Sequence, residues 1–266
     1  MVLVEKRLVE VEPGIRLAVN VSGSQDKPTI VFSNSLAASM GMWDEVAEYL
    51  APHARLVRYD TRGHGGSSAP EDGYSLERIS LDLIAILDDL SIQRAVICGV
   101  SLGGLIAMWL GIHAPNRVDG LVLANTAASF PPASMWRERA AMARQSGVTS
   151  FVEPSLDRWV TADYRQSHGP RVEELAAMIL QTSPSGYAGC CEVLAASSLL
   201  PELPRISCPV RVIAGRYDPS TPPDRASEIA MAIPQSNLVT LNAAHISCVE
   251  APSAFGEEVR QFIAGK

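Results

Sequence analysis

The chain has 266 residues, of which 47% are hydrophobic and 19% charged, and its formal net charge is −7. This composition indicates a well-cored globular protein, and the charge argues against nucleic acid as a partner, because a phosphate backbone needs a basic face. The first seven residues carry one acid and two bases, unlike a signal peptide, and no apolar run approaches the ~20 residues of a spanning helix. We therefore expect a cytoplasmic protein with no membrane partner.

In chain order, the first thirty residues predict two strands around Pro13-Gly14, a hairpin at the edge of a sheet. Apolar, β-rich runs then alternate with helical stretches, and their continuity is typical of strands covered on both faces. Strands are expected at 28–33, 55–60, 94–100, 118–126, 209–215 and 237–242, and helices at 40–51, 75–90, 102–113 and 252–264. The pattern predicts an α/β fold, with a mostly parallel sheet of about eight strands and helices on both faces.

The alternation of strands and helices stops between about residues 131 and 204. This segment opens with "FPPAS", closes with "PELPRISCP" and contains helical, alanine-rich stretches without a clear strand. We interpret it as a helical insertion. The expected division is an α/β core at 1–130 and 205–266, with residues 131–204 forming a helical cap.

Five cysteines at irregular spacing do not make a disulfide framework. The adjacent Cys190 and Cys191 also lack the spacing of a zinc site, and we expect them to be buried thiols. The chain has no H-E-x-x-H, no Walker lysine and no dinucleotide fingerprint, so neither a metal nor a cofactor is implied.

The stretch "GVSLG", Gly99 to Gly103, fits the G-x-S-x-G pattern of a nucleophile elbow. It lies between a predicted strand and a predicted helix, where a sharp turn would lift the Ser101 hydroxyl out of the sheet. Side chains two positions away on either side would collide, which explains the glycines. The turn also directs the Leu102 amide toward the reacting oxygen. A tight glycine turn whose serine caps the helix is the alternative.

A nucleophilic serine needs a base and an orienting acid, which follow it in the order acid, histidine in this kind of fold. Asp218 comes directly after a predicted strand and is the candidate acid, with Asp224, near a helix start, as its rival. His245, again just past a strand, is the candidate base. His64, in "DTRGHGGS" upstream of the serine, fits this role less well, as do the remaining histidines.

With these residues in view, the chain resembles the α/β-hydrolase superfamily over its whole length. "DTRGHGGSS" and "GVSLGG" are superfamily motifs. More specific stretches are similar to the 3-oxoadipate enol-lactonase family: "SNSLAASMGMWDEV" (33–46), "WLGIHAPNRVDGLVLANTAA" (109–128) and "SPSGYAGCCEVLAASSL" (183–199).

The resemblance implies a serine hydrolase that opens the ring of 3-oxoadipate enol-lactone to give 3-oxoadipate, in the protocatechuate branch of the β-ketoadipate pathway. Ser101 would form the acyl-enzyme, His245 would move its proton and Asp218 would orient the imidazole. Relatives often carry His-Gly where this chain has Asn34-Ser35, so the resemblance implies that the Leu36 amide joins that of Leu102 in the oxyanion hole.

Other functions stay open on the same fold. A carboxylesterase, a carbon–carbon bond hydrolase and a cofactor-free perhydrolase would share these motifs, and a non-catalytic small-molecule binding protein could use the same scaffold. The sequence does not indicate whether the protein is a monomer or an oligomer.

The enol-lactone implied by the resemblance is an anion, and its carboxylate needs a local cation in this acidic protein. Trp136 and Arg139 share a face of a predicted helix, whereas Arg137 points about 100° away from Trp136. We expect Trp136 to line the pocket and Arg139 to hold the carboxylate, with Arg158 and Arg165 as alternatives. The competing interpretation leaves Arg137, Arg139 and Arg144 in solvent, with Trp136 packing the cap onto the core.

Overall fold

A computed structural model describes residues 4–265 of the chain. Within these residues, eight strands form one sheet in the order β1-β2-β4-β3-β5-β6-β7-β8. All pairs from β4 to β8 are parallel, while β1 and β2 are antiparallel to their neighbours. The strands are β1 (Val4–Glu12), β2 (Ile15–Ser22), β3 (Thr29–Ser33), β4 (Arg55–Tyr59), β5 (Ala95–Val100), β6 (Val118–Ala124), β7 (Val210–Gly215) and β8 (Ser236–Leu241). The predicted α/β fold is confirmed.

The N-terminal hairpin is also confirmed, because β1 pairs with β2 from Val4 to Glu12, with a register irregularity between Glu10 and Glu12. Its turn contains Gly14 at a φ of +80°, a backbone conformation that glycine adopts without a steric penalty.

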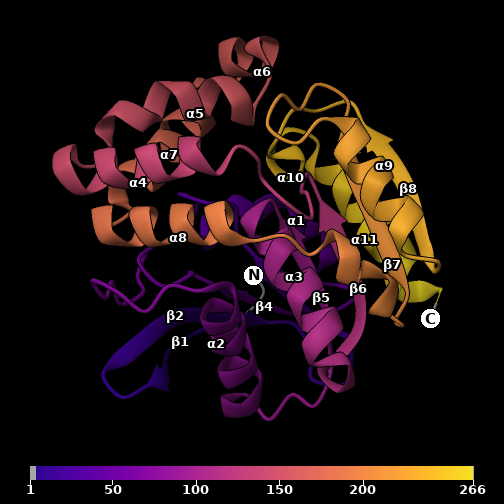
Figure 1. Cartoon of the computed structure of the whole chain (residues 1–266). Helices are drawn as coiled ribbons and strands as arrows, with labels where there is room; N and C mark the ends of the chain where they lie inside the picture. The colour runs from indigo at the N-terminus through magenta and orange to yellow at the C-terminus, as the bar shows by residue number, and fades with distance from the viewer. Residues whose placement is uncertain (1–3, 266) are drawn as a thin grey trace.

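Helices cover both faces of the sheet (Figure 1). On one face α2 packs against α3, and on the other α1 packs against α11. The helices that flank the sheet are α1 (Asp44–Leu50), α2 (Leu76–Asp89), α3 (Leu102–His113), α9 (Pro223–Ala232), α10 (Ser247–Glu250) and α11 (Pro252–Ala264). Short 3-10 helices join several elements: η1 (Met40–Trp43), η2 (Pro115–Arg117), η3 (Thr149–Phe151) and η4 (Leu200–Arg205). Ser75 caps α2 by accepting a hydrogen bond from the Arg78 amide.

Between β6 and β7 the chain forms helices that lie over one end of the sheet (Figure 1). These are α4 (Ala133–Ser146), α5 (Val152–Trp159), α6 (Ala162–Ser167), α7 (Gly169–Gln181) and α8 (Pro184–Ala196). An isolated antiparallel bridge between Ser129 and Ser198 lies at the base of this segment. Its separation from the core as a cap domain over residues 131–204 stays a prediction.

The side chains of Cys190 and Cys191 are buried free thiols, as expected from the sequence. Burial raises the pKa of Cys191 to about 12, so it stays protonated at neutral pH. Across residues 4–265, no helix is long and apolar enough to span a bilayer.

Candidate active site

Ser101 stands at the sharp turn between β5 and α3, with a φ of 57° and a ψ of −115°. A Cβ atom at Gly99 would lie 2.2 Å from the Gly103 carbonyl oxygen. One at Gly103 would lie 2.1 Å from the Ser33 carbonyl oxygen. Both contacts are far below van der Waals distance, so the elbow requires glycine on either side of the serine.

Asp218 follows β7 and accepts hydrogen bonds on both carboxylate oxygens. Oδ1 accepts from the amides of Ser220 (2.8 Å) and Thr221 (3.0 Å), and Oδ2 from the Thr221 hydroxyl (2.7 Å) and the Asn125 amide nitrogen (3.0 Å). Oδ2 also lies 2.8 Å from Nδ1 of His245. Burial alone raises the pKa of Asp218, but the nearby His245 and the hydrogen bonds outweigh it and lower the pKa to about 2.

His245 follows β8 and is 4% exposed. Because Nδ1 faces the Asp218 carboxylate, the proton of a neutral ring resides there and Nε2 is left as an acceptor. His245 and Ser101 line one cavity, although no hydrogen bond joins their side chains within the described residues. Catalytic hydrogen bonds are often long before substrate binds.

The rival acid does not reach this cluster. Asp224 is exposed in the first turn of α9, where a carboxylate favours the helix dipole. The structure therefore brings Asp218, and not Asp224, to His245.

The two amides expected to form the oxyanion hole are unpaired. Among residues 4–265, neither the Leu36 nor the Leu102 N–H donates a hydrogen bond. Leu102 begins α3, where the first amides of a helix lack intrahelical acceptors. Leu36 lines the cavity beside Ser101.

Segment 131–204 supplies the opposite wall of the cavity, including Trp136, Arg139 and Arg158. Arg139 donates a hydrogen bond to the Tyr187 hydroxyl, and its guanidinium carbon lies 5.1 Å from the Trp136 ring centroid and 5.2 Å from that of Phe151. Its Nε is buried without a hydrogen-bond partner among the described residues.

Neither Arg139 nor Arg158 forms an ion pair with a carboxylate of residues 4–265. Burial, and secondly the charge of Arg139, lower the pKa of Arg158. Arg139 and Arg158 thus line the same cavity and their positive charges repel each other, an arrangement that an anion would relieve.

The other arginines considered from the sequence lie elsewhere. Arg137 is exposed. Arg144 pairs with Glu192, and Arg165 pairs with Glu153 and Asp157. The structure thus leaves Arg139 and Arg158 as the candidate anion-binding pair.

Sequence reasoning gave no role to Asn125, Thr221 or Tyr187. Asn125 directly follows β6. A polar residue just past a strand is the same signal that pointed to Asp218 and His245, so the sequence did contain a signal for Asn125. The Asn125 side chain bridges Asp218, the Ala244 carbonyl and the Ser247 hydroxyl. Tyr187 lies within a stretch that carried the family resemblance, but its contact with Arg139 spans two helices and leaves no local pattern.

Comparisons with known proteins agree with this architecture. The family described as alpha/beta hydrolase fold matches residues 28–252. The chain is 41% identical to 3-oxoadipate enol-lactonase 2 of Acinetobacter baylyi, covering 89% of each sequence. It is 30% identical to a putative carbamate hydrolase RutD of Pseudomonas syringae, covering 90% of this chain and 95% of the relative. The crystal structure of the enol-lactonase from Burkholderia xenovorans superposes with a TM-score of 0.93 at 36% identity, covering 98% of this chain and all of the other.

The chain therefore belongs to the α/β-hydrolase family and is a hydrolase. The predicted resemblance to enol-lactonases is confirmed by two curated relatives and one solved structure that carry this name.

Proposed function

We propose that this protein hydrolyses 3-oxoadipate enol-lactone to 3-oxoadipate through an acyl-enzyme on Ser101. The observation that carries the proposal is the pair Arg139 and Arg158, which have no carboxylate partner among residues 4–265, in the cavity that Ser101 and His245 line. The similarity to enol-lactonases supports the same substrate. On that similarity we also assign the reaction to aromatic-compound catabolism by the β-ketoadipate pathway.

In the first half of the reaction, Nε2 of His245 takes the Ser101 proton as Oγ attacks the lactone carbonyl. Asp218 stays ionised and stabilises the imidazolium that forms. The tetrahedral oxyanion accepts hydrogen bonds from the Leu36 and Leu102 amides.

Collapse of this intermediate breaks the ring C–O bond and leaves an ester on Ser101. The departing enolate oxygen takes a proton from His245, and the enol becomes a ketone. Because an enolate leaves more readily than an alkoxide, this step asks little of general acid catalysis. Water, deprotonated by His245, then attacks the ester and releases the acid.

The substrate carboxylate lies, in this proposal, between Arg139 and Arg158. A guanidinium offers two parallel N–H donors to a carboxylate, and the aromatic ring of Trp136 covers the apolar part of the lactone. The anion would offset the repulsion between the two arginines, so charged lactones should bind better than neutral esters of equal size.

The test compares Arg139→Ala with Arg137→Ala, an exposed arginine on the same helix, on the enol-lactone and on neutral p-nitrophenyl acetate. Arg139→Ala should raise KM for the lactone roughly 10-fold or more, about 1.4 kcal/mol or above, because it removes ground-state binding. Aryl acetate hydrolysis should change little, and Arg137→Ala should match the parent enzyme on both substrates.

Absence of enol-lactone hydrolysis by the parent enzyme would contradict the proposed substrate. Equal loss on both substrates would show structural damage instead of a lost anion contact. An unchanged KM in folded Arg139→Ala would remove this residue from the anion site.

A further inference from the structure

His64 is a buried histidine that the proposed reaction does not use. It is 1% exposed and lies in the loop after β4, 27 residues along the chain from the loop after β3. Both of its ring nitrogens have backbone partners. Nδ1 lies 3.0 Å from the Arg62 carbonyl oxygen, and Nε2 lies 3.0 Å from the Ala37 amide nitrogen.

These two contacts define the tautomer of the ring. A carbonyl oxygen only accepts and an amide N–H only donates, so Nδ1 carries the proton and Nε2 accepts from Ala37. Burial lowers the pKa of His64 to about 4, although the Arg62 carbonyl acts in the opposite direction. The ring is therefore neutral near pH 7, and Nε2 is free of a proton and can accept the hydrogen bond from Ala37.

Ala37 is an unusual residue for this position in the backbone. Its φ is +64°, in the left-handed region that a non-glycine residue adopts only when its surroundings hold it there. It directly follows Leu36, which lines the cavity and whose amide donates no hydrogen bond among residues 4–265. The Ala37 N–H donates to His64, and this hydrogen bond fixes the orientation of the peptide group between Leu36 and Ala37. That peptide group is next in the chain to the Leu36 amide, the expected oxyanion donor.

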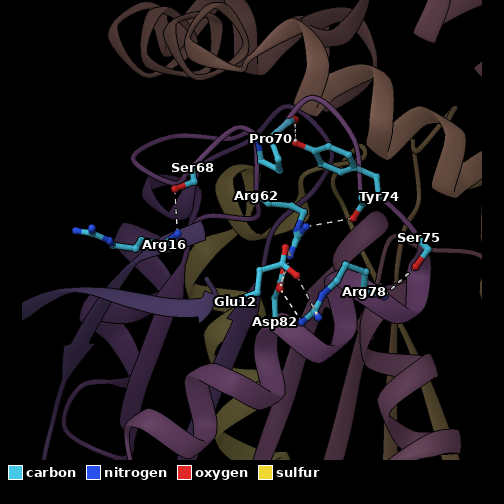
Figure 2. Close-up of polar contacts among 10 residues, drawn as sticks. Glu12, Arg16, Arg62, Ser68, Pro70, Tyr74, Ser75, Arg78 and Asp82 are labelled. Carbon is cyan, nitrogen blue, oxygen red and sulfur yellow. Dashed lines mark hydrogen bonds and ion pairs between the residues drawn. The ribbon is translucent and has the colours of Figure 1, made fainter. Parts of the chain in front are cut away.

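The loop that carries His64 is itself anchored. The buried Arg62 guanidinium forms two 2.7 Å hydrogen bonds to Asp82 on α2, and Figure 2 shows this pair beside Glu12. Nearby, Asp60 accepts from the amides of Met40 (2.6 Å) and Gly66 (2.9 Å), so it joins the same two loops.

The residue that precedes helix α8 is also hydrogen-bonded to this loop. The Ser183 amide donates to the Gly63 carbonyl at 2.9 Å. His64 therefore stands on a rigid support and contacts the Leu36–Ala37 peptide from it.

We propose that His64 is a positioning residue for the oxyanion hole, which holds the Leu36 amide in place by accepting the Ala37 N–H. The inference rests on the proposed function only in taking Leu36 as an oxyanion donor. It concerns stabilisation of any ester or lactone transition state in this cavity and does not depend on the acid released.

Two substitutions separate the two hydrogen bonds of the ring. In His64→Gln, the amide oxygen reaches the place of Nε2 and can still accept from Ala37. In His64→Asn, the shorter amide reaches only the place of Nδ1, so it can donate to Arg62 but leaves Ala37 unpaired. Both replace the imidazole with an amide, which makes each the control for the other.

The measurement is kcat and KM for p-nitrophenyl acetate and for the enol-lactone, with thermal unfolding of each variant. His64→Asn should lower kcat roughly 10-fold or more on both substrates with little change in KM, short of the 10²–10³ expected for deleting a donor outright. His64→Gln should stay within about threefold of the parent kcat because it keeps the acceptor.

Equal kcat values in the two folded variants, whether high or low, would overturn the proposal. Enzyme that cleaves the aryl ester but not the enol-lactone would defeat the proposed substrate and leave this test intact. If His64→Asn does not fold, the test is made by NMR on the parent protein. A nitrogen–nitrogen coupling across the hydrogen bond from the Ala37 amide to Nε2 of His64 supports the proposal. A proton on Nε2 overturns it.

Discussion

Replacing Asp82 with asparagine should destabilise the protein by about 3 kcal/mol, the lower end of what breaking a buried ion pair costs. The Arg62 side chain is fully buried and that of Asp82 is 1% exposed, and two hydrogen bonds of 2.7 Å join them (Figure 2). Arginine stays protonated at all ordinary pH values, so losing the carboxylate leaves a buried charge.

The magnitude follows from what remains around Arg62. Removing one partner of a buried pair costs roughly 3–5 kcal/mol, and asparagine keeps the shape of aspartate, so no cavity adds to this. The Glu12 carboxylate stays 3.1 Å from Nη2 of Arg62, but it is 32% exposed and compensates only in part. The lower end of the range therefore applies, which corresponds to a loss of roughly 6–12 °C in Tm for a chain near this size.

The assay is denaturant and thermal unfolding, with Glu192→Gln as the control. Glu192 pairs with Arg144 on the surface, where both side chains are nearly half exposed, and such pairs contribute about 0–1 kcal/mol. The double variant Arg62→Met with Asp82→Leu should be less destabilised than Asp82→Asn, because it leaves no unpaired charge. A cost for Asp82→Asn as small as that of the control would refute the reasoning.

Two further predictions concern the triad. We expect turnover to fall by several orders of magnitude in folded Ser101→Ala and His245→Ala, and somewhat less in Asp218→Asn. Because the three residues act as a unit, the double variant Ser101→Ala with His245→Ala should be scarcely less active than either single variant. An active His245→Ala or an inactive Asp224→Ala would contradict the assignment. Because the folded-state pKa of Asp218 is lowered from 3.8 to about 2, its ionised form stabilises the fold above pH 4, and this contribution is lost as pH falls toward 2. Between pH 5 and 2, the free energy of unfolding should therefore fall less steeply with decreasing pH in Asp218→Asn than in the parent protein. Equal slopes in the two proteins would contradict this prediction.

The strand-end residues were predictable from the sequence for a physical reason. In a parallel sheet the carboxyl ends of all strands meet at one edge, so residues that directly follow separate strands become neighbours. Ser101 follows β5, Asp218 follows β7 and His245 follows β8. Each strand could be read from its own apolar run, and no knowledge of pairing order was needed.

The choice among the arginines could not be made in this way. Helical spacing placed Arg139 on the face of Trp136, but Arg158 and Arg165 remained equivalent alternatives. Arg165 is set apart by its carboxylate partners Glu153 and Asp157, which lie eight or more residues away. Such pairings depend on how helices pack, which single-helix periodicity does not specify.

The place of His64 upstream of Ser101 fits the role of base less well, and nothing in the sequence points to its contact with Ala37. That hydrogen bond joins a side chain to a backbone amide, and such a bond leaves no signature in the residue that donates it. The positive φ of Ala37 was equally hidden, because alanine does not signal the left-handed region as glycine does.

Hydrogen bonds join the helices over the sheet to the loop that carries His245. The Ile246 amide donates to the Trp159 carbonyl at 2.8 Å, and Glu250 accepts from the amides of both Ala244 and Thr161. The end of α5, which carries Arg158, is thereby joined to the loop that carries His245. Under the proposed function, a displacement of this helix would therefore move the proposed base and the proposed anion site together.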